Sequence, residues 1–255
     1  MASAIMPWLL SGGTLTLHQP FDPPIFEKQT QDDGCDVLVA PAPLILQDAF
    51  LDGPTSLRHL IGVWRTPELA ARSILWTRGD IAMTDVLLFG EIGLLAARRL
   101  ADGAPAPLPS TTCDARRSRG TASEIALTPH DTLGLRGAMV PHAAYYVNQS
   151  GDPLACDHVD TGYGVQRNTV TGTVEIVSAP SGLVNVGGYR FRASDLDEWA
   201  QRLAPDVTLG FVPDPLNGSR LVGRAHNNTR AAAALSELGL NPLMVAAFRD
   251  RNSTL

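Results

Sequence analysis

Hydrophobic residues in the first half of the chain fall into short blocks that are separated by helix-starting signals. Three blocks rich in β-forming residues, 36–40, 56–63 and 82–89, predict buried strands. Asp22-Pro23-Pro24 and Thr66-Pro67-Glu68 predict helix starts, because a side-chain oxygen caps the first turn and proline suits its first positions. Strands that alternate with helices in this way predict an α/β layer with parallel strands. Further expected elements are a helix over 2–10, a strand over 14–18 and a helix over 44–51.

The second half of the chain follows a different pattern, in which strands come first and helices later. Strands expected at 123–127, 132–140 and 174–177 predict a small β subdomain. An expected strand at 187–191 then precedes a helix, two strands and two further elements, which predicts an α+β domain. These last elements are the strands 207–212 and 219–225, the helix 229–238 and a helix or strand that starts at Asn241-Pro242.

A change in composition separates the two halves. Residues 102–122 are rich in proline, glycine and alanine and carry a short basic cluster, which is typical of a surface loop or linker. Phosphate binding by the arginines of this cluster is an alternative to a solvated loop, which we favour. We therefore expect an α/β layer over 1–110, a β subdomain with its linker over 111–180, and a shortened C-terminal α+β domain over 181–255.

Composition and charge narrow the class of protein. The chain has 255 residues, of which 44% are hydrophobic, which is enough for a packed core. A formal net charge of −6 and the lack of a long basic run argue against binding nucleic acid or an anionic membrane. We expect neither a bilayer-spanning segment nor a signal peptide. Three widely spaced cysteines predict free thiols in a reducing cytoplasm, and Cys156 with His158 provides too few ligands for zinc.

The stretch from Asp157 to Asp197 combines its features in an order that chance rarely produces. A turn at Thr161-Gly162 leads to the strand 174–177, and a small flexible patch and a Gly-Gly-Tyr-Arg-Phe strand at 187–191 follow. This order resembles the junction between the large and small domains of adenylate-forming (AMP-binding) enzymes, the superfamily of acyl-CoA synthetases, peptide-synthetase adenylation domains and luciferases. The resemblance implies a partial adenylate-forming enzyme fold. It extends over about residues 7–248 and corresponds to roughly the second half of a full-length member.

A matching pattern precedes this stretch. Ser56-Leu57-Arg58 resembles the start of a central strand of the large domain. After the next strand the family carries Tyr-Gly-x-Thr-Glu-x-Gly, and in the aligned segment 87–93 Glu91 and Gly93 coincide with that pattern. The resemblance implies that Glu91 helps to hold magnesium, at the end of a strand where α/β sheets bind ligands. The alternative is an ordinary loop carboxylate.

The nucleotide-binding part of the pattern is incomplete. The family reads Trp-x-x-Thr-Gly-Asp, in which the aspartate accepts hydrogen bonds from both ribose hydroxyls. Here Thr161-Gly162 is kept, while Tyr163 stands in place of the aspartate and His158 in place of the tryptophan. Asp160 is a candidate for the carboxylate from a shifted turn, and the alternative is that it braces the turn. The implied nucleotide-binding residues are therefore Glu91, Gly93, Asp160, Thr161 and Gly162.

The best-kept motif is Gly187, Gly188, Tyr189 and Arg190, which resembles the segment that opens the small domain of the family. In the family this segment lines the tunnel for the pantetheine arm of coenzyme A. Glycine suits that place because it lets the backbone approach a ligand closely. The alternative is a bulge before an edge strand.

Several polar groups of the family's site are absent. Ala179 stands where the family has an arginine, Ser181 or Gly182 where it has the hinge acid, and Asn185 where it has a lysine. The chain also lacks the Ser/Thr/Gly-rich phosphate loop and the terminal Gly-Lys motif, and its only lysine is Lys28. No residue is therefore singled out as catalytic.

These observations leave three functions open. The first is an AMP-forming acyl-CoA synthetase-like ligase, truncated or degenerate and inactive alone. By resemblance it would use ATP, Mg²⁺ and coenzyme A to activate a carboxylic acid, as in fatty acid metabolism. The second is a non-catalytic relative that binds a ligand or a partner, which the missing charge-stabilising groups favour. The third is an unrelated α/β interaction domain. Because half a fold exposes sheet edges, we also expect a partner chain that supplies the N-terminal half, or self-association.

Overall fold

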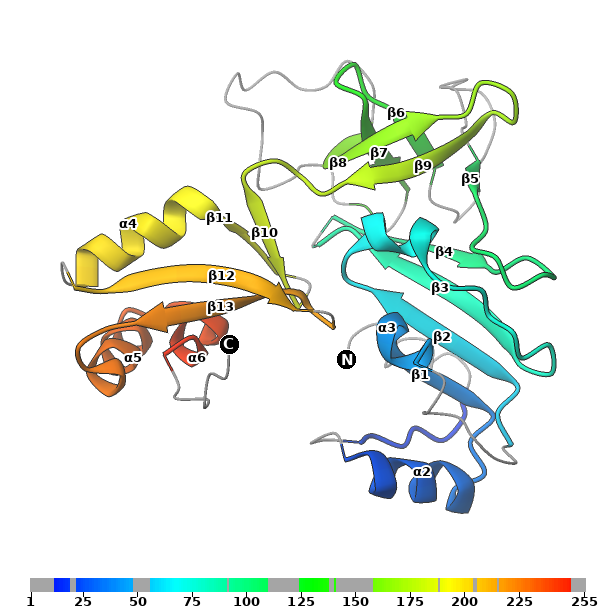
Figure 1. Cartoon of the computed structure of the whole chain (residues 1–255), viewed down its shortest axis with the longest axis horizontal. Coiled ribbons are helices and arrows are strands. Elements are labelled where there is room, and N and C mark those ends of the chain that lie inside the picture. Colours follow the sequence, from blue (N-terminus) through cyan, green and yellow to red (C-terminus); the bar gives the residue numbers. More distant parts are fainter. Residues whose placement is uncertain are drawn as a thin grey trace. The chain divides into compact units, whose positions relative to one another are not determined.

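The computed structural model describes residues 12–18, 22–47, 56–90, 92–109, 124–137, 140, 158–187, 189–203, 206–214 and 216–248. The chain forms two compact units, each assembled from separate parts of the sequence. Figure 1 labels the helices and strands. The first unit comprises 1–64, 73–86 and 96–106, and the second comprises 65–72, 87–95 and 107–255. Parallel and antiparallel sheets both occur, which confirms the predicted combination of α/β and α+β structure. Within the described ranges, no helix is long and apolar enough to cross a membrane.

The first four strands form one sheet with the order β1-β2-β3-β4. They are β1 (Val37–Pro41), β2 (His59–Trp64), β3 (Ala82–Leu88) and β4 (Leu94–Arg98). The pair β1 and β2 is parallel, with Val37 opposite His59, as the alternation of strands and helices predicts. Helix α2 (Pro23–Asp32) precedes β1, and Asp22 caps it by accepting a hydrogen bond from the amide of Ile25 at 3.1 Å.

A buried ion pair stabilises the interior of the first unit. Arg99 Nε donates to Asp85 Oδ2 at 2.9 Å, and both side chains are almost completely buried. Trp64 Nε1 donates to the other carboxylate oxygen of Asp85 at 2.8 Å. The guanidinium of Arg99 also donates to the Ile74 carbonyl oxygen and to the Ser73 hydroxyl, each at 2.8 Å. Both charges are therefore compensated, which a buried ion pair requires.

The second unit contains an antiparallel sheet with the order β5-β9-β8-β7-β6. Its strands are β5 (Leu108–Pro109), β6 (Glu124–Leu127), β7 (Thr132–Arg136), β8 (Val159–Arg167) and β9 (Thr173–Ser178). In β8 the side chains of Thr161, Tyr163 and Val165 are buried, and the residues between them are more exposed. Because successive side chains of a strand point to opposite faces, this alternation directs Tyr163 into the protein.

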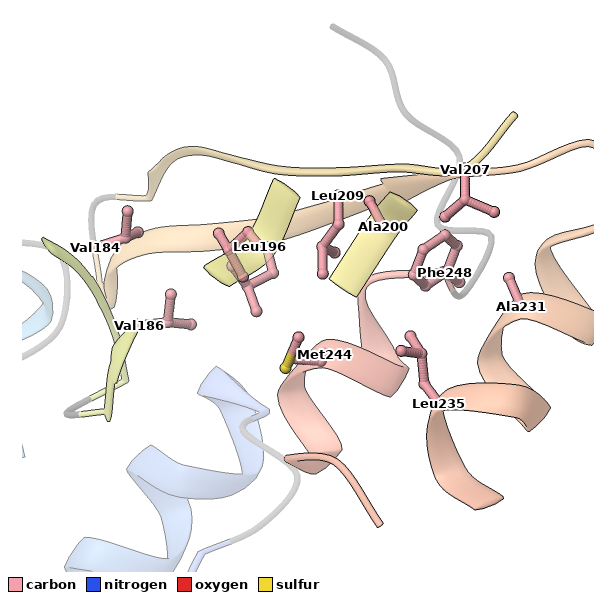
Figure 2. Packing of buried hydrophobic residues seen from close by; sticks show 11 residues of the cluster. Val184, Val186, Leu196, Ala200, Val207, Leu209, Ala231, Leu235, Met244 and Phe248 are labelled. Carbon is pink, nitrogen blue, oxygen red and sulfur yellow. The ribbon is translucent and has the colours of Figure 1, made fainter. Parts of the chain in front are cut away.

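A second sheet and three helices complete this unit. The elements are β10 (Leu183–Val186), β11 (Tyr189–Arg192), α4 (Ala193–Leu203), β12 (Thr208–Asp214), β13 (Gly218–Arg224), α5 (Asn228–Glu237) and α6 (Pro242–Ala246). The sheet has the order β11-β10-β13-β12. Side chains from β10, α4, α5 and α6 meet in one apolar core, which Figure 2 shows around Leu196, Leu235 and Met244. Leu196 and Ala200, one helical turn apart on α4, form the core face of that helix.

Three predicted elements differ from the structure. Residues 14–18 form no strand, because none of the described strands pairs with them and satisfies their backbone groups. The helix predicted from Thr66 is a short 3₁₀ helix, η2 (Pro67–Arg72), whose buried Pro67 and Ala70 are three residues apart, the repeat of that helix. The helix predicted over 44–51 is, in the described part, α3 (Ala42–Ile45). The helix predicted over 2–10 lies outside the described residues.

Candidate ligand-binding site

Three segments that are far apart in the sequence meet inside the second unit. They contribute Phe89 and Gly90 after β3, Tyr163 on β8, and Asn185 and Arg190 on the β10–β11 hairpin. The rings of Phe89 and Tyr163 pack edge to face with their centroids 5.4 Å apart, and Arg190 Cζ lies 5.4 Å from the centre of the Tyr163 ring. A side-chain carbon at Gly90 would lie 2.5 Å from Arg190 Nε, so this approach requires glycine. The predicted nucleotide-binding and coenzyme A-binding segments are therefore neighbours.

Tyr163 lies at the centre of this site. Its side chain has no solvent exposure, and Asn185 Nδ2 donates a hydrogen bond to its hydroxyl oxygen at 2.6 Å. Burial raises the pKa of Tyr163 to about 12; the positive charge of Arg190 opposes this rise, and the charge of Glu68 adds to it. The phenol is therefore neutral at physiological pH, in contrast to the acceptor-only carboxylate that the family has at this position.

The predicted nucleotide-binding residues of β8 make hydrogen bonds within the β7–β8 pair. Asp160 Oδ1 accepts from the Thr132 hydroxyl at 2.7 Å and from the amide of Gly162 at 2.8 Å. The Thr161 hydroxyl donates to the carbonyl oxygen of Leu133 at 2.7 Å. Gly162 has a φ of +74°, which favours glycine. These bonds brace the backbone around Gly162, and contact of the three residues with a nucleotide stays a prediction.

The predicted coenzyme A-binding segment presents one side chain to the interior and one to solvent. Arg190 is 7% exposed, and its Nη1 donates to the carbonyl oxygen of Thr161 at 3.0 Å. Tyr189, the preceding residue of β11, points to the opposite face and is 49% exposed. Gly187 donates its amide hydrogen to the carbonyl oxygen of Asn217 at 3.2 Å. Gly188 lies outside the described residues, and coenzyme A binding by this segment stays a prediction.

The predicted magnesium ligand, Glu91, also lies outside the described residues. Gly93 follows in the turn after β3, where its carbonyl oxygen accepts a hydrogen bond from the amide of Phe89 at 2.9 Å. In the part of the chain that the structure describes, no three His, Cys, Asp or Glu side chains come together as a metal-binding group. Magnesium binding through Glu91 therefore stays a prediction.

The segment after β2 adds two charged residues that sequence reasoning misses. Burial raises the pKa of Glu68, and its Oε2 has no hydrogen-bond partner among the described residues. Burial lowers the pKa of Arg65, and the negative charge of Asp214 acts in the other direction by raising it. The Arg65 guanidinium donates a hydrogen bond to Asn217 Oδ1. In the sequence, the only sign of these two buried charges is that a charged residue stands on each side of Thr66-Pro67. Charged residues at a solvent-exposed helix start give the same pattern.

The Tyr163 side chain does not fit the ribose of a nucleotide. Two ribose hydroxyls need acceptors, whereas the Tyr163 hydroxyl already accepts a hydrogen bond from Asn185 and its ring fills the space beside Phe89. Asn185 Oδ1 is buried at the same place and has no partner in the described part of the chain. Tyr163 therefore stands, buried and already hydrogen-bonded, at the sequence position where the resemblance implies a ribose-binding carboxylate.

A separate groove lies between α4 and β12. It has a volume of about 420 Å³, and its lining includes Asp197, Gln201, Gly210, Phe211 and Arg224. None of the predicted site residues lines it.

The fold belongs to a known structural class: it is about half of the fold shared by adenylate-forming enzymes, as the sequence resemblance predicts. A malonyl-CoA ligase solved with methylmalonyl-CoA and AMP bound matches with a TM-score of 0.58 and 16% identity, over 99% of this chain and 58% of its own. The amide bond synthetase McbA from Marinactinospora thermotolerans matches with a TM-score of 0.57 and 14% identity, over 93% of this chain and 52% of its own. An artificially fused adenylation–PCP di-domain, NpsA-ThdA from Klebsiella oxytoca, matches with a TM-score of 0.58 and 14% identity, over 92% of this chain and 52% of its own.

These similarities concern the fold, which many unrelated functions can share. The chain spans about half the length of the solved structures that it matches. No protein-family model matches the sequence, and no curated protein sequence matches it.

Proposed function

We propose that this chain is a relative of AMP-forming acyl-CoA synthetases that does not activate a carboxylic acid by itself. The observation that supports the proposal is the side chain of Tyr163, which is completely buried among Phe89, Asn185 and Arg190. In the family that the sequence resembles, a carboxylate at this position accepts hydrogen bonds from the ribose of ATP. A neutral phenol that is already hydrogen-bonded and packed does not replace that carboxylate.

The composition of the chain supports the same proposal. Stabilisation of transition-state charge is usually the largest catalytic term, and positively charged groups supply it in phosphoryl chemistry. The sequence has no Ser/Thr/Gly-rich phosphate loop, and its single lysine is Lys28 of α2. Binding of ATP and Mg²⁺ by this chain alone would therefore depend on Glu91, the one residue that resembles a magnesium ligand. The cytoplasmic location expected from the cysteines is part of this proposal.

The ligand class that we propose is coenzyme A or an acyl thioester of a small carboxylic acid. The half-exposed ring of Tyr189 offers an apolar body and a polar tip beside the turn of Gly187, whose φ of +60° suits glycine. A pantetheine arm combines apolar stretches with amide groups, so it can pack against such a ring and hydrogen-bond to the turn.

Calorimetric titration with coenzyme A tests the retained binding. The wild type is expected to bind, and Tyr189→Ala to weaken binding by about tenfold. Phe211→Ala is the matched control, because Phe211 on β12 is an aromatic residue that is equally exposed, at 50% against 49%. Failure of the wild type to bind coenzyme A contradicts the ligand assignment. Pyrophosphate release from ATP by the purified wild type, dependent on a carboxylic acid, contradicts the inactivity.

A second candidate function, one half of a two-part ligase, is favoured by the edge of the first sheet. Among the described strands, β1 is the outermost of that sheet, and its Val37 and Val39 are 47% and 36% exposed. A strand edge with exposed valines is a template for pairing with another chain. We propose that a separate chain, which carries the N-terminal half of the fold, pairs with the β1 edge. When the protein is purified alone, a second copy of this chain pairs with that edge instead.

Sedimentation of the purified chain tests this edge. The wild type is expected to associate, and Val39→Lys to shift it toward the monomer, because a charge on an edge strand opposes pairing. Leu238→Lys is the control, because Leu238 is also an exposed apolar residue, at 57%, but lies at the C-terminal end of helix α5 and not in a strand. A monodisperse wild-type monomer contradicts the self-association.

A further inference from the structure

The Tyr163 side chain is buried between residues that come from distant parts of the sequence. The side chain contacts three others from different segments: Phe89 after β3, Asn185 on β10 and Arg190 on β11. Its exposure is zero, so the ring is enclosed on all sides. Protein interiors relax only partly when a large side chain is shortened, and a hollow remains. A smaller residue at position 163 would therefore leave a hollow comparable in size to a sugar ring.

The wall of this space carries a donor and an acceptor on one side chain. Asn185 is 8% exposed; its Nδ2 donates to the Tyr163 hydroxyl at 2.6 Å, and its Oδ1 is buried without a partner in the described part of the chain. Each hydroxyl of a vicinal diol can donate one hydrogen bond and accept others. One hydroxyl of a diol can thus accept from Nδ2 while its neighbour donates to Oδ1. The amide that Tyr163 covers is therefore complementary to a sugar.

We propose that Tyr163 determines the specificity of this site: its ring excludes the ribose of a nucleotide from walls that otherwise match a sugar diol. The inference rests on the proposed function, in which the chain does not hold ATP, and it assigns the exclusion to one side chain. The missing phosphate loop gives a different explanation for the same behaviour. AMP separates the two explanations, because it has no β- or γ-phosphate for such a loop to bind.

The test is calorimetric titration of AMP into the purified full chain and three variants. Tyr163→Asp opens the space and adds an acceptor for the diol, Tyr163→Ala only opens it, and Tyr163→Phe keeps it filled. We expect no heat from the wild type or Tyr163→Phe at roughly millimolar AMP, and Tyr163→Asp to bind at least about tenfold more tightly. Tyr163→Ala should fall between them. With 2′,3′-dideoxy-AMP, which lacks the diol, the gain should disappear.

Two results overturn the inference. One is AMP binding by the wild type or Tyr163→Phe that is as tight as binding by Tyr163→Asp. The other is a Tyr163→Asp variant that is folded by circular dichroism and gives no heat. If Tyr163→Asp does not fold, Tyr163→Ala decides the question without an added charge, and the lack of a gain in that variant is equally contradictory. Pyrophosphate release by the wild type would overturn the proposed function instead, so the two failures appear in different assays.

Discussion

Replacing Tyr163 with phenylalanine removes one hydroxyl and keeps the ring, which makes the role of that hydroxyl measurable. At neutral pH the variant loses the hydrogen bond that Asn185 Nδ2 donates at 2.6 Å and leaves a buried amide donor without an acceptor. A buried polar group that loses its partner costs about 1–3 kcal/mol of the free energy of unfolding. We therefore expect Tyr163→Phe to be less stable than the wild type by that amount at pH 8.

The pKa of Tyr163 predicts that this difference changes with pH. Burial raises the pKa from its usual value of 10 to about 12, so above pH 10 the unfolded chain loses a proton that the folded chain keeps. The stability that comes from the neutral phenol is complete below pH 10 and is lost as the pH rises to 12. This rise in pKa corresponds to about 3 kcal/mol. The wild type should lose that amount relative to Tyr163→Phe, which has no group to ionise.

Urea denaturation followed by circular dichroism, from pH 8 to pH 12, measures this change in both proteins. The free energy of unfolding of the wild type minus that of Tyr163→Phe should fall from about 1–3 kcal/mol to near or below zero. Subtraction cancels the titration of groups that do not interact with the Tyr163 hydroxyl. A difference that stays constant over this range would refute the conclusion that the Tyr163 phenol is buried and neutral.

Two further substitutions each test the interior of one unit: Asp85→Ala in the first unit and Gly223→Ala in the second. Asp85→Ala leaves the buried guanidinium of Arg99 without its carboxylate and should lower the free energy of unfolding by about 3–5 kcal/mol in urea denaturation. Asp80→Ala, which breaks an ion pair on the surface, should leave the midpoint unchanged, and equal effects of the two would contradict the buried pair. Gly223→Ala places a carbon 2.5 Å from an aromatic ring of the core and should cost about 1–3 kcal/mol in thermal unfolding. Gly210→Ala on the neighbouring strand meets open space and should change stability by less than about 0.5 kcal/mol; a Gly223→Ala variant as stable as this control would contradict the packing.

Local signals predict much of the fold. Asp22 followed by two prolines predicts the start of α2, and the spacing of Leu196 and Ala200 predicts the buried face of α4. These features depend on residues that are close together in the sequence, so the sequence alone is sufficient to predict them. The 3₁₀ form of η2 is not predictable in this way, because it depends on what Pro67 and Ala70 pack against.

The candidate site is less predictable, because it depends on contacts between distant segments. The motifs place Thr161 in the predicted nucleotide-binding set and Arg190 in the predicted coenzyme A-binding set, and in the structure Arg190 Nη1 donates to the carbonyl oxygen of Thr161 at 3.0 Å. The sequence around Asn185 and the sequence around Tyr163 give no sign that these two side chains form a hydrogen bond. Glu68 is a third example, since its raised pKa comes from burial that only the folded chain provides.

The measurement that tests the central claim most directly is calorimetric titration of the wild-type chain with Mg-ATP. The account predicts no heat at roughly millimolar ligand, because we propose that the buried Tyr163 excludes the ribose, and the sequence has no phosphate loop to hold the triphosphate. Binding that is clearly detected, and that weakens in Glu91→Gln, would contradict the account and show that a working nucleotide site survives in this chain.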